Sequence, residues 1–129
     1  MTAVAAIINY NGKVLVGKKR SDSKKILAGQ WHIPGETIEG NETDEEALIR
    51  GMEEETGLDI LIGSYIASSI TPTPHSNIRW YECFAQTDKT RCGSDLEEIR
   101  WVSKREVLNE CSPEAVSRWP QKVVDYFAH

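Results

Sequence analysis

The sequence has few cysteines and no long apolar run, and each absence excludes a class of protein. Its three cysteines, Cys83, Cys92 and Cys111, are odd in number and widely spaced, so free thiols in a reducing cytoplasm are the simplest interpretation. The best apolar run, residues 4–8, has the length of a strand, far short of the roughly 18 residues that a membrane helix needs. The N-terminus lacks a basic segment followed by a long apolar stretch, so no secretory signal is expected. We therefore expect a cytoplasmic protein that does not enter a membrane.

Basic residues are also in the minority. The chain has 15 Lys and Arg against 20 Asp and Glu, for a formal net charge of -5, and a nucleic-acid groove would need a basic stripe instead. An acidic protein can still bind an anionic polyphosphate when divalent cations lie between the two. The 129 residues, without repeat or linker, predict a single domain over residues 1–129. The sequence does not decide between a monomer and a homodimer.

Turn residues and breakers divide the chain into strands, a helix, further strands and terminal helices. Asn11-Gly12 predicts a hairpin turn. Pro34-Gly35 ends a short strand, and Pro120 divides the C-terminal helical region. This order predicts an α/β/α sandwich with a mixed β-sheet between the helices. Strands are expected at residues 2–9, 13–18, 31–33, 58–68, 78–87 and 98–102, and helical pieces at 104–109 and 113–127.

The clearest helix lies between Thr43 and Gly57. Thr43 and Glu46 have the spacing of a capping box, and an acidic first turn suits the positive end of the helix dipole. Gly57 is placed to end the helix in the left-handed conformation. The apolar stripe of this helix consists of Ala47, Leu48 and Met52.

The second half of this helix carries carboxylates that suit a metal ion. Arg50 lies one turn before Glu54, so the two side chains are neighbours on the helix surface. Glu54 and Glu55 differ by about 100° around the axis, so both can flank an ion at the helix edge. Carboxylates select hard cations, Mg²⁺ or Mn²⁺, which share their coordination with substrate phosphates and acidify a bound water. A glutamate-rich helix face is also commonly just exposed to solvent. The residues around this helix therefore decide between a metal site and a solvated face.

Residues 36–58 resemble the Nudix box, G-x5-E-x7-R-E-U-x-E-E-x-G-U, in which U is a large apolar residue. Residues 29–35 resemble the strand that enters this box, and Trp101-Val102 fits a later strand, so the resemblance spans nearly the whole chain. It implies a Nudix-type α/β/α sandwich and a MutT-like, metal-dependent hydrolase of diphosphate linkages. Aligned without gaps, the matching positions are Glu42, Arg50, Met52, Glu54, Glu55, Gly57 and Leu58.

Two positions depart from the box. Glu36 stands where the pattern opens with glycine, and Gly51 stands where the family has a glutamate that is often a metal ligand or a candidate base. The loss at Gly51 predicts weakened activity, and a helical glycine costs about 0.5–1 kcal/mol relative to alanine. Our hypothesis is that Glu36 reaches into the space beside Gly51 and restores the missing oxygen ligand. The alternative is that Glu36 points into solvent.

The resemblance implies further roles in catalysis and metal binding. Gly35 would offer its backbone carbonyl to the ion, and Arg50 would orient Glu54. Family members often take another carboxylate from the loop before the later tryptophan strand, and here Glu97 is favoured over its acidic neighbours. The catalytic set is therefore Glu36, Arg50, Glu54 and Glu55, and the metal set is Gly35, Glu36, Glu54, Glu55 and Glu97.

Four residues outside the box are candidates for contacts with substrate. Arg20 ends the second strand and could bind a phosphate with both arms of its guanidinium. His32 and Tyr81 could stack on a base, although aromatic residues serve a core equally well. Arg118 falls where some members of the family read the edge of the base.

Together these features predict hydrolysis of a diphosphate linkage in a nucleoside triphosphate or a related nucleoside diphosphate derivative, with Mg²⁺ or Mn²⁺. One alternative is a pyrophosphatase for ADP-ribose or a sugar nucleotide. Another is a nucleotide-binding module whose catalysis is impaired through Gly51. The expected partner in each case is a small nucleotide-type molecule.

Overall fold

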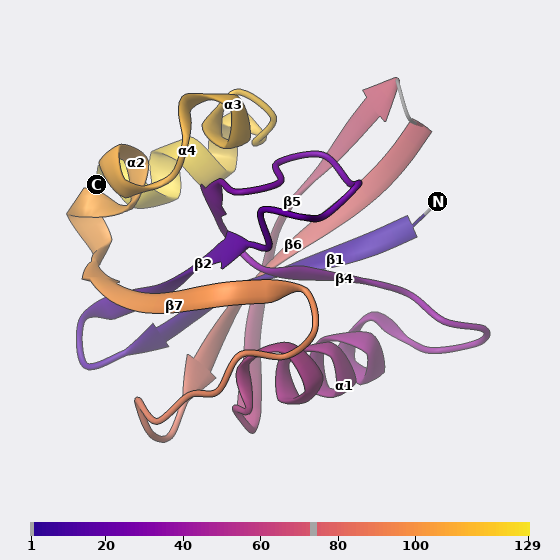
Figure 1. Cartoon of the computed structure of the whole chain (residues 1–129), viewed down its shortest axis with the longest axis horizontal. Coiled ribbons are helices and arrows are strands. Elements are labelled where there is room, and N and C mark those ends of the chain that lie inside the picture. The colour runs from indigo at the N-terminus through magenta and orange to yellow at the C-terminus, as the bar shows by residue number, and fades with distance from the viewer. Residues whose placement is uncertain (1, 73–74) are drawn as a thin grey trace.

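Helices cover both faces of one mixed β-sheet in the computed structural model of this chain, which describes residues 2–72 and 75–129. Helix α1 (Asp44–Thr56) lies on one face, and the other face carries α2 (Val107–Glu110), α3 (Pro113–Val116) and α4 (Gln121–Ala128) (Figure 1). The α/β/α sandwich with a mixed β-sheet is thereby confirmed. None of the helices in the described residues is long and apolar enough to cross a membrane.

The sheet is mixed because its two longest interior strands run in the same direction. Strand β1 pairs in parallel with β6, whereas the other pairings are antiparallel, and the order along the sheet is β3-β2-β1-β6-β5. Two strands lie off this path, since β4 pairs with β1 and β7 pairs with β2. The bounds are β1 (Thr2–Tyr10), β2 (Lys13–Lys19), β3 (Trp31–His32), β4 (Gly35–Thr37), β5 (Ile60–Pro72), β6 (His75–Ala85) and β7 (Leu96–Ser103), the last followed by the 3-10 turn η1 (Lys104–Glu106).

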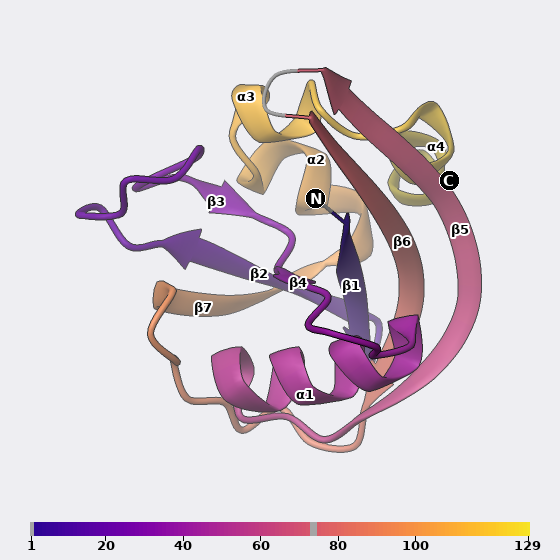
Figure 2. The same cartoon turned by 90° about the vertical axis from the view of Figure 1, so that its right-hand side faces the viewer.

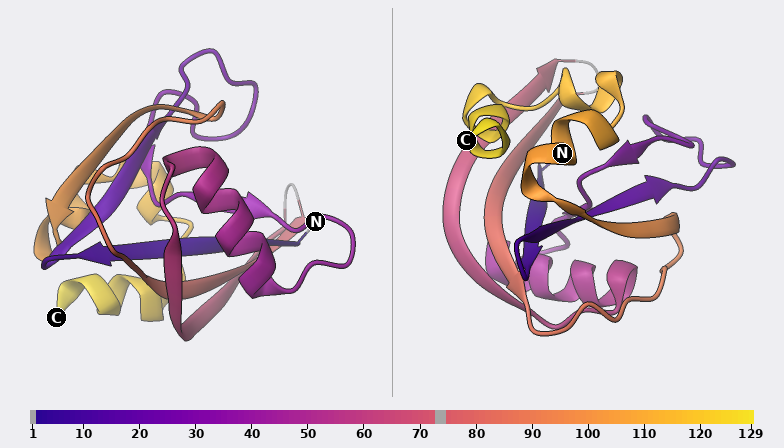
Figure 3. Two further views of the ribbon diagram at one scale, coloured as in Figure 1. Left: turned by 90° about the horizontal axis from the view of Figure 1, so that it is seen from below. Right: turned by 90° about the vertical axis from the view of Figure 1, so that its left-hand side faces the viewer.

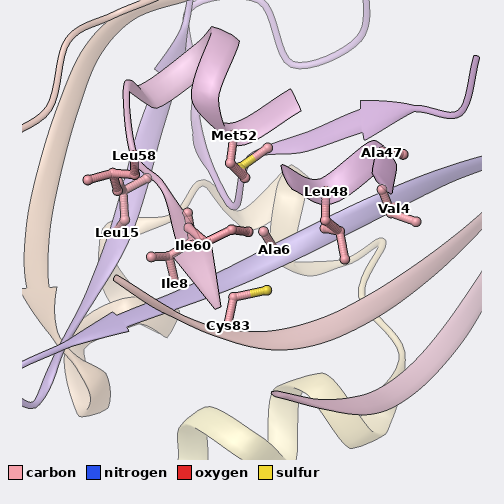
Figure 4. Close-up of a cluster of buried hydrophobic side chains, with 10 residues drawn as sticks. All are labelled: Val4, Ala6, Ile8, Leu15, Ala47, Leu48, Met52, Leu58, Ile60 and Cys83. Carbon is pink, nitrogen blue, oxygen red and sulfur yellow. The ribbon is translucent and has the colours of Figure 1, made fainter. Parts of the chain in front are cut away.

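Strand β1 lies at the centre of two apolar cores. Successive side chains of a strand point to opposite faces of the sheet, so Val4 and Ile8 pack toward α1 while Ala5 and Ile7 pack toward the C-terminal helices. Figure 4 shows the first of these cores, in which Met52 of α1 lies over the sheet. The continuous apolar run of β1 is what a strand buried on both faces requires.

Helix α1 is capped at both ends as predicted. The Thr43 hydroxyl accepts a hydrogen bond from the Glu46 amide at 3.1 Å, and the Glu46 carboxylate accepts one from the Thr43 amide at 2.9 Å. At the other end Gly57 has a φ of 74°, and its amide donates to the Glu53 carbonyl. These local contacts fix where the helix begins and ends.

The main difference from the prediction is strand β4. The sequence ended a strand at Pro34-Gly35, but Gly35–Thr37 forms a second short strand that pairs antiparallel with Ala3–Ala5 of β1. A Cβ atom on Gly35 would lie 2.8 Å from the carbonyl oxygen of Val4, so the close approach of these backbones depends on glycine. The pairing is a contact between distant segments, and it sets the position of Glu36. Pro120 separates α3 from α4, as expected.

Candidate active site

Arg50 organises the acidic residues between β4 and α1. Its Nε and Nη2 atoms donate to the two carboxylate oxygens of Glu42 at 2.7 and 2.9 Å, and Nη2 also donates to the Thr37 carbonyl at 3.0 Å. Its Nη1 atom lies 3.3 Å from Glu54 and 3.8 Å from Glu36. Figure 2 shows why these segments meet, because the chain from β4 leads directly into the turn before α1.

The contact with Arg50 fixes the charge of Glu42. The hydrogen bonds from the Arg50 guanidinium hold the pKa of Glu42 at about 2, so Glu42 stays ionised at neutral pH. A bidentate guanidinium–carboxylate pair also fixes both side chains in orientation. The pair with Glu42 thereby holds the Arg50 guanidinium in the orientation in which it contacts Glu54.

Glu36 lies against Gly51. If residue 51 carried a Cβ atom, that atom would fall 2.5 Å from both Cβ and Cγ of Glu36 and 3.0 Å from its Oε2. The Glu36 side chain is 20% exposed, and its Oε1 accepts a hydrogen bond from the Thr37 amide. The two departures from the box are therefore in direct contact, and the Glu36 side chain lies against α1 rather than in open solvent.

The segment before β7 crosses the end of α1 and holds Glu55. The Gly93 amide donates to the Glu55 carbonyl, and the Asp95 amide donates to the Glu55 carboxylate, each at 3.0 Å. A Cβ atom on Gly93 would collide with the carbonyl of Glu54. Figure 3 shows the link from β6 to β7 running past this helix end. Glu55 is thus buried and oriented, whereas the Glu54 side chain is 54% exposed.

The carboxylates here raise one another's proton affinity. Burial raises the pKa of Glu36, and the charges of Glu55 and Glu54 add to it. Burial likewise raises the pKa of Glu55, with further contributions from Asp95 and Glu54. Such a concentration of incompletely compensated negative charge fits a hard divalent cation. Within residues 2–72 and 75–129, no three side chains of the His, Cys, Asp or Glu type already converge on one point, so water and substrate oxygens would complete the coordination, as Mg²⁺ prefers.

Lys19 is a residue at this site that the sequence interpretation missed. Burial lowers the pKa of Lys19, while the charges of Asp95 and Glu55 act to raise it. The charges of these two carboxylates therefore reach Lys19, which is the last residue of β2. Leu15 packs toward α1, but the register of β2 against β7 shifts between Lys18 and Lys19, so alternation along β2 alone did not place Lys19.

Arg20 and Glu97 have other partners. The Nε atom of Arg20 is 3.0 Å from an oxygen of Asp22, and both side chains are largely exposed. The Glu97 carboxylate accepts a hydrogen bond from the Ser21 amide at 2.6 Å and lies 3.4 Å from Nζ of Lys18. The residue whose backbone and charge lie next to Glu55 is Asp95. The roles predicted for Arg20 and Glu97 in binding substrate and metal stay predictions.

Each of the remaining candidates for substrate contacts has a hydrogen-bond or ion-pair partner within the protein. The Tyr81 hydroxyl donates to the Asp44 carboxylate at 2.5 Å, and Asp44 is also held by both arms of Arg79. Arg118 lies 3.5 Å from a carboxylate oxygen of Glu114. The half-buried His32 contacts the Gly17 carbonyl through Nδ1 at 2.9 Å. A carbonyl only accepts, so Nδ1 carries the proton.

His32 gives the fold a dependence on pH. Burial, with the nearby charge of Lys19, lowers the pKa of His32 from 6.5 to about 4. Because the folded pKa is the lower one, its contribution to stability is complete above the unfolded pKa and is lost as the pH falls through the folded one. Between about pH 7.5 and about pH 5 this single group should lower the free energy of unfolding by about 2 kcal/mol.

The variant His32→Asn tests this expectation, since its amide can still donate to the Gly17 carbonyl. Urea unfolding at the two pH values should show a smaller loss of stability for the variant than for the natural chain. Equal losses in the two proteins would mean that His32 titrates alike in the folded and unfolded states.

Known proteins resemble this chain over most of its length. Residues 1–127 match the family model of the NUDIX domain. The CTP pyrophosphohydrolase of Escherichia coli (strain K12) is 38% identical, over 95% of this chain and 83% of that protein. The nucleoside triphosphatase NudI of Enterobacter sp. (strain 638) is 31% identical, over 84% of each protein.

Solved structures agree in fold. The solution structure of the E. coli ORF135 protein superposes with a TM-score of 0.73 at 25% identity, covering 96% of this chain and 88% of that one. The MutT protein from Methanosarcina mazei Go1 gives a TM-score of 0.74 at 22% identity, covering 98% and 89% respectively. The arrangement of sheet and helices is therefore shared by these proteins.

Proposed function

This chain belongs to the Nudix family of hydrolases, and on that premise we propose that it cleaves a nucleoside triphosphate into a nucleoside monophosphate and pyrophosphate with Mg²⁺ or Mn²⁺. The observation that carries this proposal is the group of carboxylates that Arg50 and the Gly93–Asp95 segment hold at the edge of α1. The names of the two relatives favour a nucleotide as the substrate.

In this proposal, residues at the edge of α1 and in β4 bind the metal ion, and their neighbours orient them. Glu54 and Glu55, with the Gly35 carbonyl, are the oxygen donors that would hold the ion, and Arg50 keeps Glu54 in orientation. A bound divalent ion would neutralise the phosphates and lower the pKa of a coordinated water. The amide of Asp95 fixes the Glu55 carboxylate, so one of the two donors is oriented before substrate arrives.

Lys19 supplies the positive charge for the substrate in this proposal. Asp95 and Glu55 are the acids whose charges act on Lys19, and an ammonium group is a point charge suited to a phosphate oxygen. Arg20 is exposed and bound to Asp22, so it would first have to leave that partner. We therefore assign the first phosphate contact to Lys19 and keep Arg20 as a second cation at the rim.

A product assay tests the proposal. The metal-free chain is mixed with CTP, ATP, GTP, UTP and the deoxynucleotides, each with Mg²⁺, with Mn²⁺ or with a chelator, and pyrophosphate and orthophosphate are measured separately. We expect pyrophosphate and a monophosphate from at least one nucleotide, with no turnover in the chelator. CTP is the first substrate to try, because one relative is named for it.

The same assay separates the alternatives. Cleavage of ADP-ribose or a sugar nucleotide, with no triphosphate turned over, would replace the proposed substrate class. Saturable binding of nucleotides without any product would instead identify a binding module, consistent with the glycine at position 51. Release of orthophosphate alone would contradict the proposed position of cleavage.

A further inference from the structure

We propose that positions 36 and 51 share one carboxylate, so that Glu36 on β4 supplies the metal ligand that the family pattern places on the helix, and the two positions cannot both carry a side chain. This inference rests on the proposed function for its metal ion. The two departures from the box are then one exchange, in which a carboxylate has moved from position 51 of α1 to position 36 of β4.

The first argument is the lack of space. A Cβ atom at residue 51 would meet the Cβ and Cγ atoms of Glu36 at 2.5 Å, far inside van der Waals contact. The atoms that collide are those next to the backbone of Glu36, and these cannot move away as the tip of a flexible side chain can. Any side chain at position 51, including alanine, therefore conflicts with glutamate at position 36.

The second argument is that β4 cannot withdraw. Residue 36 pairs with Val4 of β1, and Gly35 lies so close to that strand that even a Cβ atom there would be 2.8 Å from the Val4 carbonyl. Glu36 has an ordinary negative φ, so its backbone accepts glycine or glutamate alike. The conflict can thus be relieved only by removing one of the two side chains.

The third argument is where the Glu36 carboxylate lies. Position 51 is three residues before Glu54 and four before Glu55, so a carboxylate on residue 51 would lie beside both on the helix surface. Glu36 has its Oε2 atom 3.8 Å from Nη1 of Arg50, the same atom that lies 3.3 Å from Glu54. Glu36 thereby brings a carboxylate from the neighbouring strand to the place that residue 51 leaves empty.

The test is a double-variant cycle with two readouts, Mn²⁺ affinity of the metal-free protein without nucleotide and the melting temperature. Glu36→Gln keeps the shape of the side chain and should weaken Mn²⁺ binding by at least about tenfold. Glu36→Gly should do the same, and the exchange Glu36→Gly with Gly51→Glu should restore affinity to within about threefold of the natural chain. Gly51→Glu alone should lower the melting temperature by at least about 3 °C.

Alanine at position 51 separates the steric effect of a side chain there from the effect of an added carboxylate. Gly51→Ala should lower the melting temperature in the natural chain, yet raise it when Glu36 is already glycine, because alanine is then simply the better helix former. Ile49→Glu, at an exposed position of the same helix, adds a carboxylate away from Glu36 and should leave Mn²⁺ affinity within about threefold.

Three results would overturn the inference. One is an exchange variant that binds Mn²⁺ no better than Glu36→Gly, and another is a Gly51→Glu variant as stable and as tightly binding as the natural chain. The third is a natural chain that does not bind Mn²⁺. If the cycle behaves as expected but no nucleotide is hydrolysed, the shared carboxylate stands and only the proposed function fails.

Discussion

Replacing Glu54 with glutamine is expected to lower the turnover of the nucleotide about 10³-fold, since losing a metal ligand forfeits several kcal/mol of transition-state stabilisation. Glutamine keeps the shape of the side chain and can still accept a hydrogen bond from Arg50, which lies 3.3 Å away. The Glu54 side chain is 54% exposed, so its charge contributes little to the fold. Turnover should fall while the melting temperature remains within a few degrees of that of the natural chain.

The matched control for Glu54 is its neighbour Glu53. Glu53→Gln makes the same chemical change one residue away, where the carboxylate forms an exposed ion pair with Arg91 at 3.0 Å. Its turnover should stay within about threefold of the natural chain. Equal losses of turnover in the two variants, or an unaffected Glu54→Gln, would show that the edge of α1 formed by Glu54 is not where the reaction takes place.

Replacing Arg50 with alanine is expected to damage both stability and activity. Arg50 forms the bidentate pair with Glu42 and lies within 4 Å of Glu36, Glu39 and Glu54, so its removal leaves neighbouring carboxylates without their shared cation. Breaking a buried ion pair costs about 3–5 kcal/mol, and partial exposure of this pair reduces the expectation to about 2–3 kcal/mol. The turnover of the Arg50→Ala variant should be roughly 10–100-fold below that of the natural chain, because Glu54 loses its orientation.

Urea unfolding and steady-state turnover measure the two effects of the Arg50 substitution. Arg50→Lys is the informative companion, because an ammonium group restores the charge but not the two-armed contact with Glu42, so it should recover only part of either loss. Arg91→Ala removes an exposed arginine of the same region and should cost less than about 1 kcal/mol. An Arg50→Ala variant no less stable than Arg91→Ala would refute the organising role of Arg50.

The limits of helix α1 could be predicted because they depend on contacts within a few residues. The Thr43–Glu46 capping box and the left-handed Gly57 act over one turn of chain. The pair of Arg50 with Glu54 is likewise fixed by helical spacing. Local geometry was therefore enough to place these side chains on one edge before any tertiary contact was known.

Strand β4 and the segment before β7 could not be predicted in the same way. Three residues carry too little periodicity to indicate a strand, and Gly35–Thr37 is extended because β1 pairs with it. The Asp95 amide reaches Glu55 across 40 positions of sequence. Asp95 and Glu97 look alike in sequence, and only the tertiary path of the chain puts Asp95 next to Glu55 and puts Glu97, the second residue of β7, against Ser21 and Lys18.

The sequence by itself determined the helix, its caps, the strands other than β4 and the spacing of Arg50, Glu54 and Glu55, because these follow from dihedral preferences and from the period of side chains along one element. Only the tertiary structure decided that Glu36 lies against Gly51 and that the Asp95 amide holds the Glu55 carboxylate. Those contacts join segments whose separation in sequence carries no information about distance. They arise because β4 pairs with β1 and α1 packs on the same strand. The space between β4 and α1 then holds only one side chain from positions 36 and 51.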